Sequence, residues 1–206
     1  MICTMKQRLI KPRIFIFCNG EKAEPQYFQE CKDALGEHNI LVRNKPYKGC
    51  SPWELVNKVV TEKTRLVVKQ EFDGEVGDQC WCVFDVDEFW NQNPTKFKAA
   101  VKLAKNNEIH LAWSNECFEL WYLLHFQTLQ TGVSRNDYTT KLKTHFRRLG
   151  GKTYTKNCSV FDRILEKQPE AIKNAKQIFQ ANKVENNPST AVFKLVEEIN
   201  KYFYEN

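Results

Sequence analysis

Long hydrophobic runs are absent from the 206-residue sequence, and no apolar stretch approaches the roughly 18 residues needed to cross a bilayer. The first residues carry no apolar segment typical of a secretory signal. With 42% apolar and 13% aromatic residues, the chain is too hydrophobic to be disordered. These observations exclude membrane, secreted, fibrous and repeat proteins. We therefore expect a folded cytoplasmic protein without membrane contact.

Metal-binding cysteine patterns are also lacking. The sequence has eight cysteines but no C-x-x-C pair, so neither a zinc ribbon nor a thioredoxin-like site is expected. Cys80 and Cys82 share one face of an expected strand, yet no further ligands follow at a spacing typical of zinc sites. We interpret the cysteines as buried, reduced thiols, which agrees with a cytoplasmic location.

Strands and helices alternate in the first part of the chain. Continuous apolar runs, typical of parallel strands buried on both faces, lie at 13–18, 40–42, 80–85 and 109–113. Helical patterns follow these runs at 23–36, 51–69, 93–104 and 118–126. The second begins with a capping box, Ser51 to Glu54, and has proline at its first helical position. This order predicts an α/β fold with a four-stranded, mainly parallel sheet flanked by helices.

A helical extension is expected after the alternating part, with helices at 138–149, 159–166, 169–181 and 189–203 and no further strand. Residues 1–125 hold 17 basic and 17 acidic side chains, whereas residues 126–206 hold 14 and 8 and so carry the whole net charge of +6. We predict two parts, an α/β core over 11–126 and a basic helical extension over 127–206.

The basic residues are densest between 135 and 156, where the sequence has seven basic residues and one acidic residue. Such an excess attracts a polyanion, and the interleaved aromatic side chains could stack on bases. A solvated helix face with long lysine side chains explains the pattern equally well. The aromatic side chains are Tyr138, His145, Phe146 and Tyr154. The expected nucleic-acid-binding residues are Lys141, Lys143, Arg147, Arg148, Lys152 and Lys156.

Polar clusters follow three of the expected strands, and ligands bind beyond the carboxyl ends of strands in open α/β sheets. Asp85 and Asp87 form the clearest cluster, because two carboxylates can hold Mg²⁺ or Mn²⁺ together with phosphate oxygens. Such an ion polarises a phosphate and activates a water molecule. A plain surface turn is the alternative explanation of the D-x-D pattern.

The turn after the first strand supplies further acids. Gly20 is expected to make a tight turn, after which Glu21 or Glu24 could reach the same ion or act as a general base. An acid in a first helical turn also offsets the helix dipole, and for Glu24 this explanation is equally good.

The cluster after the fourth strand contains Ser114 and Asn115. We expect one of them to be a helix N-cap rather than a nucleophile, since no G-x-S-x-G pattern surrounds them. Glu119 lies inside an apolar helix, where an acid is either paired or functional. His125 on the same helix is expected to be a hydrogen-bonded core histidine.

In these stretches the sequence resembles the RloB-like family of restriction-locus-linked, abortive-infection proteins, a divergent branch of the Toprim fold. The matching stretches follow the family order over nearly the whole chain, and they are Ile14–Cys18, Gly20–Phe28, Val83–Asp87, Ser114–Phe126, Tyr154–Lys156 and Asn187–Val196.

The resemblance implies a magnesium-dependent nuclease and an ABC-type ATPase partner in phage defence. In Toprim proteins, a Glu before the glycine of the first turn holds the metal together with the D-x-D pair. This chain has Asn19 at that position, and an amide cannot act as a base. The resemblance therefore implies that Glu21 or Glu24 takes over, or that the site is weakened.

The hypothesis is cleavage of DNA or RNA, tRNA included, by an antiphage effector. Asp85, Asp87 and Glu21 would bind the metal, and Glu21 or Glu24 would be the base, with Glu119 and Lys156 as supporting or phosphate contacts. Two alternatives stay open. One is a non-catalytic subunit that binds nucleic acid or the ATPase, and the other is a phosphatase or transferase that uses D-x-D. Phe89 and the mid-chain position of the D-x-D pair argue against a haloacid-dehalogenase-type phosphatase. A homo-oligomer is compatible with each.

Overall fold

The computed structural model describes residues 11–156, 158–179 and 185–203, and of residues 87, 88, 202 and 203 it describes the backbone alone. The strands are β1 (Ile14–Cys18), β2 (Ile40–Arg43), β3 (Gln79–Asp85), β4 (Ile109–Asn115) and β5 (Ser189–Thr190). The helices are α1 (Ala23–Leu35), α2 (Pro52–Val68), α3 (Asp87–Gln92), α4 (Pro94–Asn106), α5 (Glu119–Leu124), α6 (Arg135–Arg148), α7 (Phe161–Ile164), the 3₁₀ turn η1 (Leu165–Lys167), α8 (Gln168–Ile178) and α9 (Val192–Phe203).

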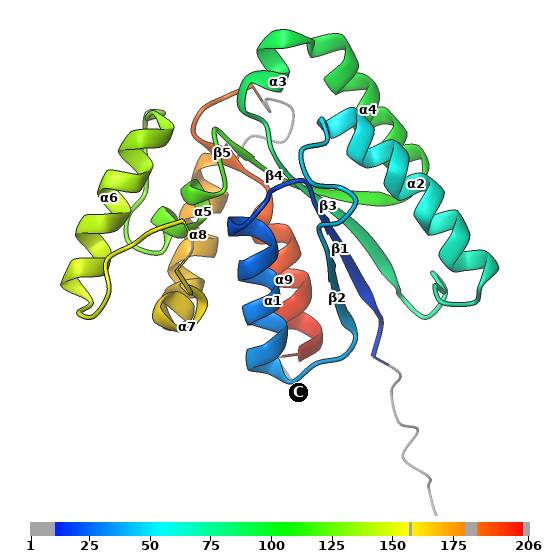
Figure 1. Ribbon diagram of the computed structural model, residues 1–206, viewed down its shortest axis with the longest axis horizontal. Coiled ribbons are helices and arrows are strands. Elements are labelled where there is room, and N and C mark those ends of the chain that lie inside the picture. Colours follow the sequence, from blue (N-terminus) through cyan, green and yellow to red (C-terminus); the bar gives the residue numbers. More distant parts are fainter. Residues whose placement is uncertain (1–10, 157, 180–184, 204–206) are drawn as a thin grey trace, which may run out of the picture.

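The strands form one sheet in the order β2-β1-β3-β4-β5 (Figure 1). The first four are parallel, as predicted, and all side chains of β1 are buried because helices cover both faces of the sheet. The prediction of four strands was one short. β5 pairs antiparallel with the end of β4, and it falls where a helix was predicted from 189 onwards.

Two hydrophobic layers enclose the sheet. On one face, α2 and α4 pack on alternate strand residues such as Phe15, Phe17 and Cys82. On the other, α1 and α9 lie against Ile14, Ile16 and the strands beside them (Figure 1). The helices of the C-terminal part join this second layer through one continuous cluster of buried side chains. The described residues after 126 are thus packed onto the α/β part through a shared core.

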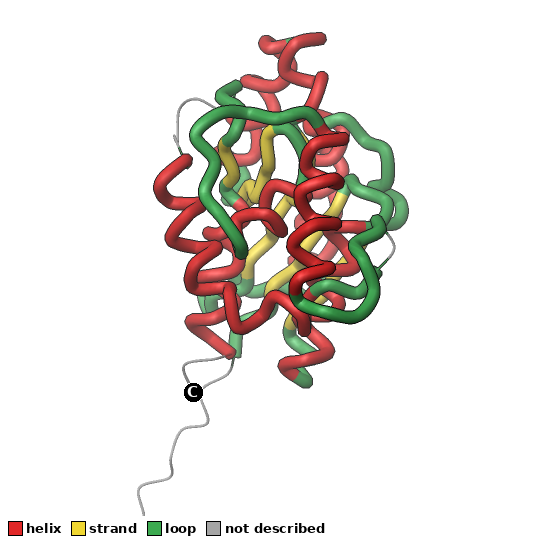
Figure 2. Tube along the Cα trace, turned by 90° about the vertical axis from the view of Figure 1, so that its left-hand side faces the viewer, coloured by secondary structure: helices red, strands yellow, loops and turns green. Residues whose placement is uncertain are grey.

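The C-terminal helices stand beside α1, with α6 packed on α5 at the edge of the molecule (Figure 1). Figure 2 looks from that side and shows the strands between helices. α6 starts at Arg135, three residues before the predicted start, because Ser134 and Asp137 form a capping box. Among the helices that the structure describes, none has the length and apolarity that a membrane crossing requires.

Two predicted boundaries at the functional edge need correction. The residues after β3 were expected to form a turn, but helix α3 begins there at Asp87. Ser114 and Asn115 were expected to cap a helix, but both belong to β4, and α5 begins after Phe118 without a side-chain cap. The capping box at Ser51 and Glu54 is present, which confirms the predicted start of α2.

Candidate active site

A cavity of about 350 Å³ opens at the carboxyl ends of β1 and β3, beside the start of α5. The apolar run of β1 ends at Cys18, and the chain turns at Gly20 into α1, so that Glu24 lies in the first helical turn. The lining combines three strand-end clusters with two side chains from the C-terminal part. It consists of Gly20, Glu21, Lys22, Ala23, Glu24, Asp85, Phe118, Glu119, Arg135 and Lys156.

Two buried carboxylates dominate the electrostatics of the cavity. Glu24 and Glu119 are only 4% and 3% exposed. Burial and, to a smaller degree, the nearby Glu119 carboxylate raise the pKa of Glu24 to about 7. A backbone hydrogen bond to the carboxylate and the positive charges of Arg135 and Lys156 oppose the rise. Glu24 can therefore accept or release a proton near neutral pH, which is the property of a general base.

The C-terminal part supplies the cations that balance these acids. Arg135 Nη2 lies 3.2 Å from Asp85 Oδ2, and Lys156 Nζ lies 3.7 Å from Glu119 Oε1. The Tyr154 hydroxyl donates to the same Glu119 oxygen at 3.5 Å. Lys156 was predicted as a supporting contact, whereas Arg135 was not singled out. Arg135 lies at the cavity because it is the first residue of α6, directly after the cap residue Ser134.

Gly20 is required by the position of Glu24. A Cβ atom on residue 20 would lie 1.9 Å from Glu24 Oε2, closer than any non-bonded contact allows. A side chain here would displace the carboxylate from the cavity. The predicted role of Gly20 as a turn residue thus has a second reason, which is space for the acid.

Glu21 and Asn19 lie differently from Glu24. Glu21 stands at the rim with 59% of its side chain exposed, and it pairs with Lys48 at 2.6 Å, which lowers its pKa. Asn19 is buried beside the cavity, and its Nδ2 donates to the Cys50 carbonyl oxygen at 3.0 Å. Asn19 does not line the cavity, because this bond draws its side chain to the loop before α2. The side chain of Asp87 lies outside the described residues.

Two further predicted site residues, Ser114 and His125, make contacts within the fold and do not line the cavity. Ser114 Oγ shares a hydrogen bond of 2.9 Å with Thr190 Oγ1 and so joins β4 to β5. His125 is buried, and its Nδ1 lies 2.9 Å from the Trp121 carbonyl oxygen. Among the described residues, His125 Nε2 has no hydrogen-bond partner. Burial lowers the pKa of His125 to about 4, so the ring is neutral at pH 7.

The basic surface extends from the cavity along α6. Lys143, Arg147, Arg148, Lys152 and Lys156 are exposed, and Lys141 is half-buried. The expected stacking of bases on aromatic side chains was wrong for Tyr138, Phe146 and Tyr154, which are 0–1% exposed. They form the apolar face with which α6 and the following loop pack on the core. His145 is stacked on Phe126, with 4.7 Å between ring centroids.

The donor chemistry of the cavity suits a hard cation. Within the described part of the chain, no three His, Cys, Asp or Glu side chains form a cluster that could hold a metal ion. Magnesium does not need one, because it is commonly held by one or two carboxylates together with waters and phosphate oxygens. Asp85, on a wall with other carboxylates, is a donor of this kind and fits magnesium or manganese.

Comparison with known proteins identifies one family. The family model described as RloB-like protein matches residues 14–199, which include every described residue of the cavity. No curated protein and no solved structure shows significant similarity to the chain.

Proposed function

The chain belongs to the RloB-like family, and from that premise we propose that it is a Toprim-like, magnesium-dependent nuclease that acts in abortive infection. The observation that carries the proposal is the cavity at the carboxyl edge of the sheet, where a carboxyl with a pKa of about 7 lies among Asp85, Arg135 and Lys156. Such a combination can hold a phosphodiester and move a proton at the same place. An ABC-type ATPase as partner is part of the same proposal.

The chain's own residues divide the work of hydrolysis. The guanidinium of Arg135 and the ammonium of Lys156 bind the non-bridging phosphate oxygens and stabilise charge in the transition state. Glu24, when ionised, accepts the proton of the attacking water. Asp85 would hold magnesium, which when bound polarises the phosphate. Asp87 is proposed as the second carboxylate at the metal on the sequence pattern alone.

The first experiment is calorimetric titration of the wild type with Mn²⁺ and Mg²⁺, followed by cleavage assays on single-stranded DNA, duplex DNA and tRNA. We expect Asp85→Asn to abolish metal binding and cleavage. Glu24→Gln should keep metal binding but lower kcat by about 100-fold or more, the usual contribution of a general base. The kcat/KM of the wild type should rise with pH through about 7, the pKa of Glu24.

Glu75→Gln is the matched control, because Glu75 is an exposed acid in the loop before β3. It should change neither metal binding nor cleavage. Equal cleavage by the wild type, Asp85→Asn and Glu24→Gln would contradict the proposal. Binding of nucleic acid without cleavage at any metal concentration would favour the other reading of the Asn19 substitution, a non-catalytic subunit that binds nucleic acid or the ATPase.

A further inference from the structure

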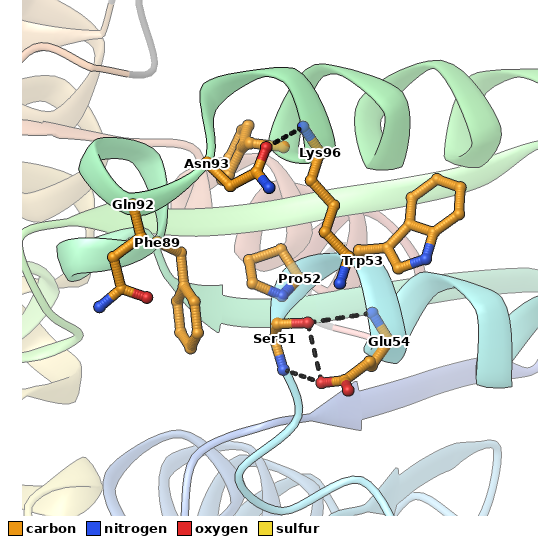
Figure 3. A pocket seen from close by; sticks show the side chains of 9 residues that line it. Ser51, Pro52, Trp53, Glu54, Phe89, Gln92, Asn93 and Lys96 are labelled. Carbon is orange, nitrogen blue, oxygen red and sulfur yellow. Dashed lines mark hydrogen bonds between the residues drawn. The ribbon is translucent and has the colours of Figure 1, made fainter.

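A second pocket, of about 370 Å³, lies at the same edge of the sheet on the face covered by α2 and α4. Figure 3 shows it between the beginning of α2, helix α3 and the beginning of α4. Phe89 and Gln92 extend side by side from α3, next to Ser51 and Pro52, while Asn93 and Lys96 stand at the start of α4 (Figure 3). The mechanism proposed above does not use this pocket.

The pocket adjoins the catalytic cavity through two chain segments. Gly20 lines the cavity and Ser51 lines the pocket, and their neighbours Asn19 and Cys50 are joined by the 3.0 Å hydrogen bond described above. On the other side, Asp85 lines the cavity and Phe89 lines the pocket four residues later, at most about 14 Å away. An extended single strand covers that distance in a few nucleotides.

The pocket wall suits a flat, uncharged group better than a phosphate. Phe89 and Trp53 are half-buried and keep part of each ring accessible. Among the described residues of the lining, Lys96 is the only cation, and its charge is partly offset by the nearby Glu54 carboxylate, whose pKa it helps to lower. Ser51 and Glu54 already cap the start of α2, so the backbone there is not available to an anion.

Two amide side chains, Gln92 and Asn93, also line the pocket. The side-chain oxygen of Asn93 accepts from the Lys96 backbone N–H at 2.9 Å and caps α4, which leaves its nitrogen as the donor toward a ligand. An aromatic wall with a few amide groups is the usual surrounding of an unstacked base. A volume near 370 Å³ is in the range of small-ligand pockets.

We propose that this pocket binds one unstacked nucleobase of a single-stranded nucleic acid, next to the phosphate that is cleaved. The inference rests on the proposed function, since the strand that delivers the base is the substrate of the neighbouring cavity. The base stacks on Phe89, and the Asn93 amide donates to its edge. The pocket thereby fixes the register of the strand and selects substrates with an unpaired base near the scissile bond.

The test measures binding of fluorescein-labelled single-stranded DNA and RNA pentamers by anisotropy, with EDTA present so that no cleavage occurs. Phe89→Leu keeps an apolar side chain but removes the ring, and it should weaken binding about 5- to 150-fold, the effect of losing one base–aromatic stack. Phe89→Tyr should restore the affinity. Phe179→Leu is the matched control, because Phe179 is also half-buried but packs on Trp113 and Phe193, away from the pocket.

A second arm uses pentamers that lack one base in turn. The wild type should lose affinity at one position, and Phe89→Leu should show no further loss there. Equal affinity of the wild type and Phe89→Leu for every pentamer, with cleavage in Mg²⁺ intact, would overturn this inference alone. Absence of any binding would overturn this inference, and absence of cleavage of every substrate in the assays above would overturn the nuclease proposal with it. A base-dependent loss in Phe89→Leu without cleavage by the wild type would support the pocket and contradict the nuclease.

Discussion

Glu24 connects the chemistry of the cavity to the stability of the protein. Its pKa is about 7 in the folded state, against an ordinary value of 4.5, because the carboxyl is buried near Glu119. Between these values the folded state keeps a proton that the unfolded state has lost. The free energy of unfolding therefore falls as pH rises from 4.5 to 7, by about 3 kcal/mol on the usual conversion.

A buried histidine works in the opposite direction. The pKa of His125 is lowered from 6.5 to about 4, so the unfolded state binds its proton first as pH falls. This residue makes the free energy of unfolding rise between pH 4 and 6.5. Between pH 4.5 and 6.5 the two residues change the free energy of unfolding in opposite directions, so the pH profile of the wild type shows neither effect by itself. A variant of one residue is needed to expose the other.

We predict that Glu24→Gln gains stability relative to the wild type as pH rises from 5 to 8, because glutamine has no proton to lose. Urea unfolding at four or more pH values measures the difference, with midpoint and slope fitted separately. Glu75→Gln, an exposed acid, should run parallel to the wild type. A Glu24→Gln profile parallel to the wild type would mean that Glu24 titrates at an ordinary pKa in the fold.

At the level of elements, the short strand β5 ties the C-terminal part to the sheet. Thr190 Oγ1 shares a hydrogen bond with Ser114 Oγ, donates to the Trp113 carbonyl at 3.0 Å and accepts from the Val192 N–H at 3.2 Å. All of these bonds are buried. Buried polar groups that lose their partners cost about 1–3 kcal/mol, so this residue is a sensitive point of the junction.

We predict that Thr190→Val lowers the free energy of unfolding by about 1–3 kcal/mol, because valine keeps the shape but leaves Ser114 Oγ and the Val192 N–H without this partner. Thermal and urea unfolding check the value. Thr140→Val is the control, since Thr140 is exposed on α6 and bonds only within its own helix, to the Asn136 carbonyl. An equal loss of unfolding free energy in the two variants would show that the buried hydrogen bonds of Thr190 add nothing to the stability of the protein.

The sequence predicted the long elements and missed two short ones, the strand β5 and the helix α3. Four parallel strands are visible because each is a continuous apolar run with helices between them, as in Ile14–Cys18. β5 has two residues and α3 has six, too few to show a period of 2 or 3.6. Their positions are decided by contacts across the fold, for example Ser114 with Thr190.

The sequence predicted those residues of the candidate site whose positions follow from the topology of the sheet alone. Glu24, Asp85 and Glu119 line one cavity because the carboxyl ends of parallel strands meet at one edge. Arg135 was missed because its approach to Asp85 depends on how α6 packs, 50 residues further along the chain. Tyr138 and Phe146 were misjudged as stacking platforms, although their spacing of eight places them on one helical face.

For the whole molecule, the proposed function implies one path for a nucleic acid. α6 begins with Arg135 at the cavity and is about 21 Å long, from the helical rise per residue. Its exposed face carries Lys143, Arg147 and Arg148 away from the sheet at the edge of the molecule (Figure 1). The proposed base pocket is lined by Phe89, four residues after Asp85 of the cavity. A single strand can thus follow α6, cross the cavity and place a base beyond it.

This path predicts which charges govern the dependence of binding on salt. Arg147→Gln combined with Arg148→Gln removes two phosphate contacts and should lower the slope of log affinity against log salt by about 1.4 for a single strand, at 0.7 per contact. Lys102→Gln with Lys105→Gln removes the same charge from exposed positions on α4 and should leave the slope unchanged. Anisotropy titrations between about 50 and 200 mM KCl measure both slopes. Equal changes in the two double variants would mean that net charge, and not the surface of α6, attracts the nucleic acid.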